Sequence, residues 1–173
     1  MCKLGCYKLY EDSILPTFGT KQSACFDIYS YLPFNDTIDC YSTQNVKLPI
    51  YCCPQDTDAP RYIEIIEGMR VLIPTGLIFD IPTGYSVRIH ARSGLSLKSG
   101  IIVANGEGII DCDYVDQAYI MLTNRSMEKH KIYHGERIAQ GELVKSLDYS
   151  IEQCYTTPSK KSNRTGGFGS TGS

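Results

Sequence analysis

Several short clusters in this sequence hold residues that could do chemistry, and the most suggestive is at the end of the chain. Residues 163–173 combine many glycines with Arg164, Phe168, Ser170 and Thr171. Glycine lets backbone N–H groups approach anionic oxygens, a guanidinium pairs with phosphate, and an aromatic ring offers a flat face to a planar base. The composition is therefore typical of a segment that closes over a phosphate-bearing ligand. A glycine-rich end can also be an ordinary flexible terminus.

Two internal clusters offer groups that bind phosphate oxygens. Arg92, Ser93 and Gly94 follow an alternating segment, and a cation, a hydroxyl and a glycine at a strand end are what a backbone nest for phosphate requires. Gln140 ends another alternating segment, where its amide could donate to a phosphate. The ordinary alternatives are a polar turn for the first cluster and a solvated strand face for the second.

Carboxylates form the remaining clusters. On an extended segment Asp111 and Asp113 would project from the same side, where they could hold a metal ion, a water or a sugar hydroxyl. An acidic surface hairpin is the commoner reason for such a pair. Asp27 stands alone among apolar neighbours, and its ordinary interpretation is a turn cap.

The elements that must position these residues are predicted to be short strands. Apolar alternation and punctuation by glycine and proline indicate strands over residues 69–73, 77–81, 85–91, 101–104, 117–123 and 136–144. Residues 93–98 could form one helical turn. Many short strands at this spacing predict an all-β, jelly-roll-like barrel.

The pattern loosens between residues 31 and 68, where several prolines interrupt aromatic and β-branched patches. We interpret this segment as an inserted loop with a hairpin around residues 45–51. The predicted organisation is a β-barrel core over residues 1–155, followed by a flexible C-terminal lid over residues 156–173.

Length and composition bound the class of protein. The chain has 173 residues, 42% of them hydrophobic and 21% charged, which suits one soluble domain. A formal net charge of -2 argues against a broad basic face for nucleic acid, although a local pocket for a small anion stays open. Because no apolar run resembles an export signal or a membrane span, we expect a cytoplasmic protein, or a nuclear one in a eukaryotic host.

Cysteine is abundant, with eight residues in the chain. Without an export signal these are expected to be free thiols that behave as small apolar residues. No Cys-x-x-Cys pair exists, and Cys52 and Cys53 are adjacent, with His90 the nearest histidine. The spacing therefore predicts no structural metal site.

Taken together and in this order, the clusters resemble the five motifs of the trimeric dUTPase family. The resemblance covers most of the chain outside residues 31–68. It is carried by residues 15–20 with 23–30, then 92–95, then Asn105, Gly108, Ile110, Asp111, Asp113 and Tyr114, then 135–140, and finally 166–172.

The resemblance implies an enzyme that cuts dUTP between the α and β phosphates, giving dUMP and pyrophosphate, with Mg²⁺ held by the triphosphate. Asp111 is similar to the carboxylate that activates the attacking water, and Asp27 to one that acts through the water shell of the metal. The positions similar to the family's phosphate-binding residues are Arg92, Ser93, Gly94, Gln140, Arg164, Ser170 and Thr171.

The resemblance also assigns the nucleoside pocket and the assembly. The positions similar to its nucleoside-binding residues are Asn105, Gly108, Ile110, Tyr114 and Phe168. Tyr114 would pack beneath the deoxyribose and leave no room for a 2′-hydroxyl, and Phe168 would stack on the base. Family members are homotrimers whose sites are shared between subunits, so the C-terminal segment would act as a lid.

Two other functions fit parts of the pattern. A dCTP deaminase, or a bifunctional deaminase and dUTPase, would share the fold, but residues 111–114 and the Gly-Gly-Phe-Gly tail favour the pyrophosphatase. A regulatory module could instead use the fold to bind a protein through residues 31–68. The sequence also departs from the family pattern: Cys25 replaces a common glycine, and Arg164 lies two rather than three positions before the glycine pair.

Overall fold

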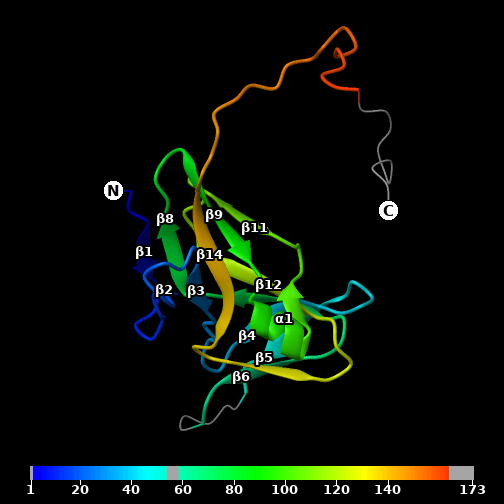
Figure 1. The fold of residues 1–173 in the computed structure, drawn as a ribbon. Helices are drawn as coiled ribbons and strands as arrows, with labels where there is room; N and C mark the ends of the chain where they lie inside the picture. The colour runs from blue at the N-terminus through cyan, green and yellow to red at the C-terminus, as the bar shows by residue number, and fades with distance from the viewer. Residues whose placement is uncertain (1, 54–58, 164–173) are drawn as a thin grey trace.

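The structure is a computed structural model that describes residues 2–53 and 59–163, shown in Figure 1. Among these residues there are fourteen strands and one short helix, so the all-β prediction is confirmed. No helix in the described part of the chain has the length and apolar character needed to cross a membrane.

Most strands belong to two five-stranded sheets (Figure 1). The first has the order β10 (Ile101–Val103), β12 (Tyr119–Asn124), β7 (Arg70–Pro74), β4 (Thr37–Tyr41), β5 (Lys47–Tyr51). The second has the order β11 (Gly108–Asp111), β9 (Tyr85–His90), β14 (Arg137–Lys145), β3 (Phe26–Tyr29), β2 (Thr17–Phe18). Two ribbons pair β1 (Gly5–Lys8) with β8 (Leu77–Asp80) and β6 (Tyr62–Ile65) with β13 (His130–Tyr133).

One hydrophobic core lies between the sheets. Alternate residues of β9 and β3, such as Val87, Ile89 and Ile28, share a buried cluster with Val71 and Ile120 of the facing sheet. Because successive strand residues point to opposite faces, the residues between them must lie on the face turned away from this core. That outward face of the second sheet carries the polar residues of the candidate site.

The predicted strand segments all contain strands in the structure, and the predicted helical turn is a seven-residue helix, α1 (Ser93–Ser99). Gly100 ends this helix with a positive φ of 65°, which glycine adopts without strain. Gly135, expected at the turn before the last strand, also has a positive φ, of 74°.

A hairpin is present within residues 31–68, formed by β4 and β5, which pair antiparallel. It spans residues 37–51, so the predicted range of 45–51 covers only part of its turn and its second strand. Two features of this segment were not predicted. Strand β4 joins the main sheet by pairing with β7, and β6 buries Ile63 and Ile65 in the core. Strands β4 and β6 are therefore part of the folded body of the domain, and the segment is more than a loop on its surface.

After β14 the chain leaves the body of the molecule (Figure 1). Residues 146–163 form no strand, and all of them are exposed. Apart from Ser146, whose N–H donates to the Gly84 carbonyl oxygen at 2.9 Å, the segment extends away from the two sheets (Figure 1).

Candidate active site

Asp27 lies at the centre of a polar cluster on the outward face of β3. It is only 6% exposed. Its Oδ2 lies 3.1 Å from Nη1 of Arg137, and its Oδ1 lies 3.4 Å from Nε of Arg92. Nε2 of Gln140 donates to Oδ1 at 3.3 Å. The interpretation of Asp27 as a turn cap is wrong, because the residue lies in a strand and its carboxylate pairs with two cations. We term Asp27, Arg92, Arg137 and Gln140 the Asp27 cluster.

Strand register explains how this cluster forms. Gln140 on β14 lies directly opposite Asp27 on β3 and opposite His90 on β9. Arg92 follows the end of β9 by two residues and is the N-cap residue of α1. Three segments that are distant in the sequence are thus brought together because their residues align across the neighbouring strands β3, β14 and β9.

Arg137 belongs to the cluster because of a β-bulge. Strict alternation along residues 136–140 would put Arg137 and Gln140 on opposite faces. The register of β14 against β3 shifts between Arg137 and Ala139, so Arg137 lies opposite Tyr29 on the outward face. Sequence reasoning included Arg137 in a motif but did not select it as a site residue. A bulge cannot be read from alternation alone.

The Asp27 cluster carries surplus positive charge near the surface. Two guanidinium groups face one carboxylate, and the side chains of Arg92 and Arg137 are 23% and 53% exposed against 8% for that of Asp27. Ser93 and Gly94, the first residues of α1, are also exposed. Cationic and hydroxyl donors thus reach solvent while the carboxylate is held behind them, an arrangement suited to a phosphate.

A second group of predicted residues lies around β11. Asn105 sits in the tight turn before this strand, and Tyr114 follows it, with its hydroxyl donating to the carbonyl oxygen of Gln117 at 2.9 Å. Gly108 is needed for close packing, because a Cβ there would lie 3.0 Å from Cβ of Ile89. Asp111 is exposed at the end of the strand.

Two small cavities border this hairpin. Asn105, Gly108 and Ile110 line one of about 120 Å³, while Ile110, Asp111 and Tyr114 line one of about 280 Å³. Burial raises the pKa of Tyr114 above its ordinary value, so its hydroxyl stays protonated at neutral pH. The hairpin therefore presents a neutral aromatic side and an acidic end.

The expectation that Asp111 and Asp113 project together from one extended segment is wrong. Strand β11 ends at Asp111, and residues 112 and 113 form a turn closed by the Tyr114 N–H, which donates to the Asp111 carbonyl oxygen at 3.2 Å. Asp111 alone is presented by the strand.

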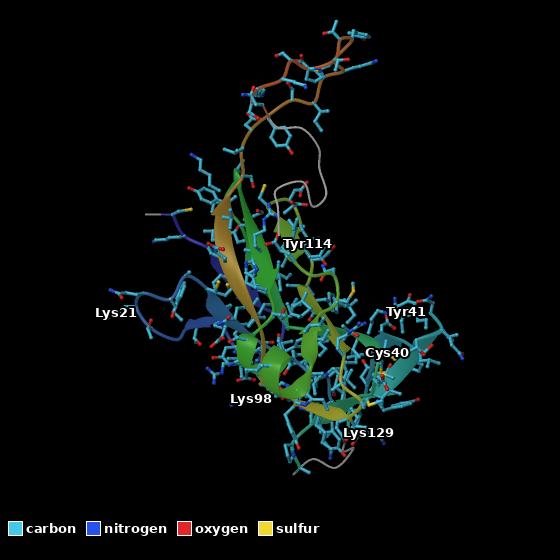
Figure 2. All side chains as sticks on the ribbon, turned by 45° about the vertical axis from the view of Figure 1, so that its right-hand side comes forward. Lys21, Cys40, Tyr41, Lys98, Tyr114 and Lys129 are labelled. Atoms are coloured by element: carbon cyan, nitrogen blue, oxygen red, sulfur yellow. The ribbon has the colours of Figure 1, made fainter. Side chains whose placement is uncertain are left out.

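Asp111, at the far end of the hairpin, lies apart from the Asp27 cluster within one chain, whereas Gly108 at the start of the hairpin is opposite Ile89, next to His90. Asp111 is opposite Ser86 at the start of β9, whereas Gln140 is opposite His90 at its end. With a rise of roughly 3.3 Å per residue, this stretch of strand is about 13 Å long. In Figure 2, Tyr114 beyond the hairpin and Lys98 on α1 lie toward opposite ends of the body. Within the described residues of one chain, Asp111 therefore stands away from the Asp27 cluster.

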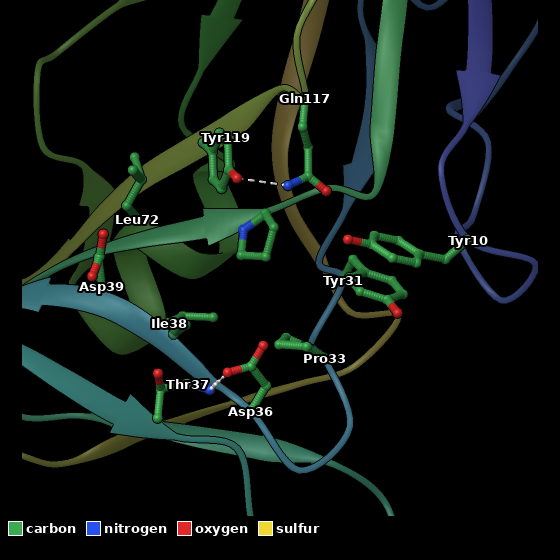
Figure 3. Close-up of a pocket in the computed structure, with 11 residues that line it drawn as sticks. Tyr10, Tyr31, Pro33, Asp36, Thr37, Ile38, Asp39, Leu72, Gln117 and Tyr119 are labelled. Atoms are coloured by element: carbon green, nitrogen blue, oxygen red, sulfur yellow. Dashed lines mark hydrogen bonds between the residues drawn. The ribbon is translucent and has the colours of Figure 1, made fainter.

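A larger cavity of about 460 Å³ holds none of the predicted site residues (Figure 3). Tyr10 and Tyr31 stack at one side of it, with ring centroids 4.2 Å apart, and Asp36 lies on the inserted segment. Tyr119 accepts a hydrogen bond from Nε2 of Gln117 at 2.7 Å and also borders the hairpin cavities. The inserted segment thus adjoins the hairpin region.

The four tail residues predicted to bind ligand, Arg164, Phe168, Ser170 and Thr171, lie outside the described residues.

The fold and the two residue groups define a class of proteins: all-β domains with a cationic cluster on one sheet and a hairpin that ends in a carboxylate. Comparison with known proteins specifies the family. The model of the dUTPase family matches residues 55–172, more than half of the chain. The chain belongs to the dUTPase family.

Relatives and solved structures agree with this membership. A deoxyuridine 5′-triphosphate nucleotidohydrolase of Nautilia profundicola is 35% identical over 98% of this chain and 99% of its own. One of Brucella melitensis is 42% identical over 65% of this chain and 71% of its own.

The similar structures are phage dUTPases. A variant dUTPase of Staphylococcus bacteriophage 80alpha with dUpNHpp superposes with a TM-score of 0.72 at 21% identity, covering 99% of both chains. A variant dUTPase from phage phi11 of S. aureus, described with a structural Mg(II) ion, has a TM-score of 0.67 at 18% identity, covering 91% of this chain and 99% of its own. At these identities the likeness concerns the fold.

Proposed function

We propose that this protein hydrolyses dUTP to dUMP and pyrophosphate. Family membership supports this activity, as do the names of relatives that align along nearly the whole chain. The observation that carries the proposal is the pairing of a cationic cluster around Asp27 with an acidic hairpin that ends in Asp111, since triphosphate hydrolysis needs both an anion site and a base.

Asp111 is proposed as the general base. Its exposed carboxylate accepts a proton from a water whose oxygen forms a new bond to the α-phosphorus. The bond from that phosphorus to the α–β bridging oxygen breaks, and its electron pair leaves with pyrophosphate. Arg92, Ser93 and Gln140 hold the phosphate oxygens and offset the charge that develops on the leaving group.

Mg²⁺ enters in this proposal with the triphosphate, where it neutralises phosphate charge. The environment of Asp27 bears on its role. Both carboxylate oxygens already face guanidinium or amide groups, so contact through a metal-bound water fits this residue better than direct ligation. Asp27 also keeps Arg92 and Arg137 oriented toward the anion.

The hairpin is proposed as the nucleoside pocket. Tyr114, Asn105, Gly108 and Ile110 border its two small cavities. A ring packed beneath the sugar excludes a ribose 2′-hydroxyl, and a close backbone excludes the methyl group of thymine. Selectivity for dUTP over UTP and dTTP follows.

We infer a homotrimer with shared sites, in which the hairpin of one chain meets the Asp27 cluster of another. The separation of the two groups along β9 supports this assembly. So does the segment after β14, where Leu147, Tyr149, Ile151 and Tyr155 are 82%, 76%, 91% and 88% exposed. Large apolar side chains along an extended segment indicate a surface that another chain covers. Residues 156–173 would then close over a neighbouring site.

The proposal is tested by incubating the purified protein and Mg²⁺ with each deoxynucleoside triphosphate and with UTP, while pyrophosphate and ammonia are followed separately. We expect substantial turnover of dUTP only, with pyrophosphate and no ammonia. Ammonia from dCTP would identify a deaminase instead, and comparable turnover of dTTP or UTP would contradict the proposed pocket.

A further inference from the structure

A second polar cluster lies beside the Asp27 cluster on the same sheet face. Cys25 just before β3, Glu142 on β14 and His90 at the end of β9 place one thiol, one carboxylate oxygen and one ring nitrogen within 4.8 Å of one another. Nε2 of His90 lies 3.7 Å from Oε2 of Glu142. All three residues are partly buried, so the cluster is shielded yet accessible from solvent.

A supporting carboxylate stands behind the histidine. Nδ1 of His90 lies 3.7 Å from Oε1 of Glu107, and Oε2 of Glu107 accepts a hydrogen bond from Nη1 of Arg88 at 3.3 Å. A carboxylate facing the remote nitrogen is the usual support of a metal-bound imidazole, because it fixes the ring and its tautomer. Arg88 in turn fixes that carboxylate.

The geometry points to a binding site for a Zn²⁺-type divalent cation, with Cys25, His90 and Glu142 as ligands. Sulfur, imidazole nitrogen and carboxylate oxygen are the three donor types that Zn²⁺ takes, whereas Mg²⁺ prefers oxygen alone. Tetrahedral zinc bonds of 2.0–2.3 Å put neighbouring donor atoms roughly 3.3–3.6 Å apart. The present separations need only small rotations of partly exposed side chains.

The alternative without a metal is an ion-pair chain in which Cys25 takes no part. A protonated His90 between Glu107 and Glu142 would account for those three residues as an ion-pair chain. The thiol has no role in that chain, and burial together with the charge of Glu142 raises its pKa, which keeps it protonated. A bound dication reverses this effect, because it stabilises the thiolate as a ligand.

The proposed site uses none of the residues assigned to the nucleotide, although it lies beside them. The three ligands come from the segments around β3, β14 and β9, so a bound ion would link the elements that also carry Asp27, Gln140 and Arg92. Three protein ligands leave a fourth position for water, as in zinc sites that stay open.

The test is a titration of the reduced full-length protein with Zn²⁺ by calorimetry, and with Co²⁺ by absorption, in buffer with Mg²⁺ and without nucleotide. We expect one ion per chain and a cobalt–thiolate charge-transfer band. Cys25→Ser should abolish the band, while Cys154→Ser, which removes an exposed thiol elsewhere, should retain it. Glu107→Gln should weaken binding about tenfold to a hundredfold.

His90→Gln and Glu142→Gln should each weaken binding as well, with circular dichroism confirming that the variants are folded. Absence of binding at micromolar Zn²⁺, or binding and a charge-transfer band that survive Cys25→Ser, would overturn the site. Because no nucleotide is present in this titration, neither result bears on the proposed dUTPase activity, which is tested by the turnover assay described above.

Discussion

At the scale of the residue, Asp111 is the side chain whose replacement should separate chemistry from binding. Asp111→Asn keeps the size and removes the base, so we expect turnover to fall by about 10²–10⁴-fold. The phosphate-binding residues are untouched, and dUTP binding measured by calorimetry should stay within a few fold of the original. Turnover close to that of the unaltered protein would show that another group takes the proton.

Asp27 should contribute to stability as well as to the site. Asp27→Asn leaves the guanidinium groups of Arg92 and Arg137 without their shared carboxylate, so we expect the free energy of unfolding to fall by about 1–3 kcal/mol. Asp39→Asn is the matched control, because its ion pair with Lys47 is exposed and should cost less than about 1 kcal/mol. Urea unfolding measures the free energy of unfolding of both variants. Equal losses in the two would contradict the claim that the buried carboxylate of Asp27 contributes more than the exposed one of Asp39.

Sequence reasoning identified Asp27, Arg92 and Gln140 as separate candidates. That they contact one another could be known only from the register of the strands. Their residue types and motif order are visible in the sequence. The pairing of β14 with both β3 and β9 joins segments far apart in the sequence, and hydrophobic periodicity within each segment does not predict it. The same is true of Cys25 and His90, which the sheet brings together although sequence reasoning considered only the spacing of Cys52 and Cys53 from His90.

At the scale of the element, the C-terminal segment should matter for turnover and little for folding. Removing residues 156–173 deletes chain that is exposed wherever it is described. We expect kcat/KM for dUTP to fall at least about tenfold and the melting temperature to shift by less than about 3 °C. Steady-state kinetics and calorimetry on the truncated protein measure kcat/KM and the melting temperature. Unchanged kinetics would show that the C-terminal segment does not act as a lid.

The turn between β13 and β14 should make stability depend on pH through His134. The Leu32 N–H donates to Nδ1 of His134 at 3.1 Å, so the neutral ring is required. Burial, with the charge of Arg61, lowers the pKa of His134 below its ordinary 6.5, although Asp12 opposes the shift. Since the unfolded chain binds the proton more readily, this contribution is complete above about pH 6.5 and is lost as the pH falls toward the folded pKa.

We therefore expect the unfolding free energy to fall as the pH is lowered below about 6.5, and to fall less steeply in His134→Gln. Urea unfolding across this range gives the slope. Identical slopes in the two proteins would mean that the histidine stays neutral in both the folded and unfolded states, or titrates equally in both.

Most elements of the main sheets were predictable, and the exceptions have physical reasons. Alternation bounded by glycine and proline located β7, β8 and β9 closely. Strand β5 was located within the predicted hairpin although Pro49 lies inside it, and the proline is tolerated because β5 is the edge of its sheet. Its partner β4 was not predicted as a strand of the main sheet. Strand β6 is short and follows Pro60, so its buried isoleucines offered too little pattern.

At the scale of the whole molecule, the account depends on cooperation between chains. Asp111 lies toward one end of β9 and Gln140 opposite the other end, so the proposed site draws on more than one chain. In the proposed trimer, a closed ring of identical subunits would place the hairpin of each chain against the Asp27 cluster of the next. We expect the mass in solution to be three times that of the chain, and light scattering measures it.

The most direct measurement mixes two inactive variants, Asp111→Asn and Arg92→Ala, under conditions that allow subunits to exchange. Each hybrid trimer then contains one site with an intact hairpin from one chain and an intact cluster from another. With equal amounts and random exchange, dUTP turnover should recover to about a quarter of the original activity. A mixture that stays as inactive as its components, although exchange is demonstrated, would show that hairpin and cluster do not act across chains.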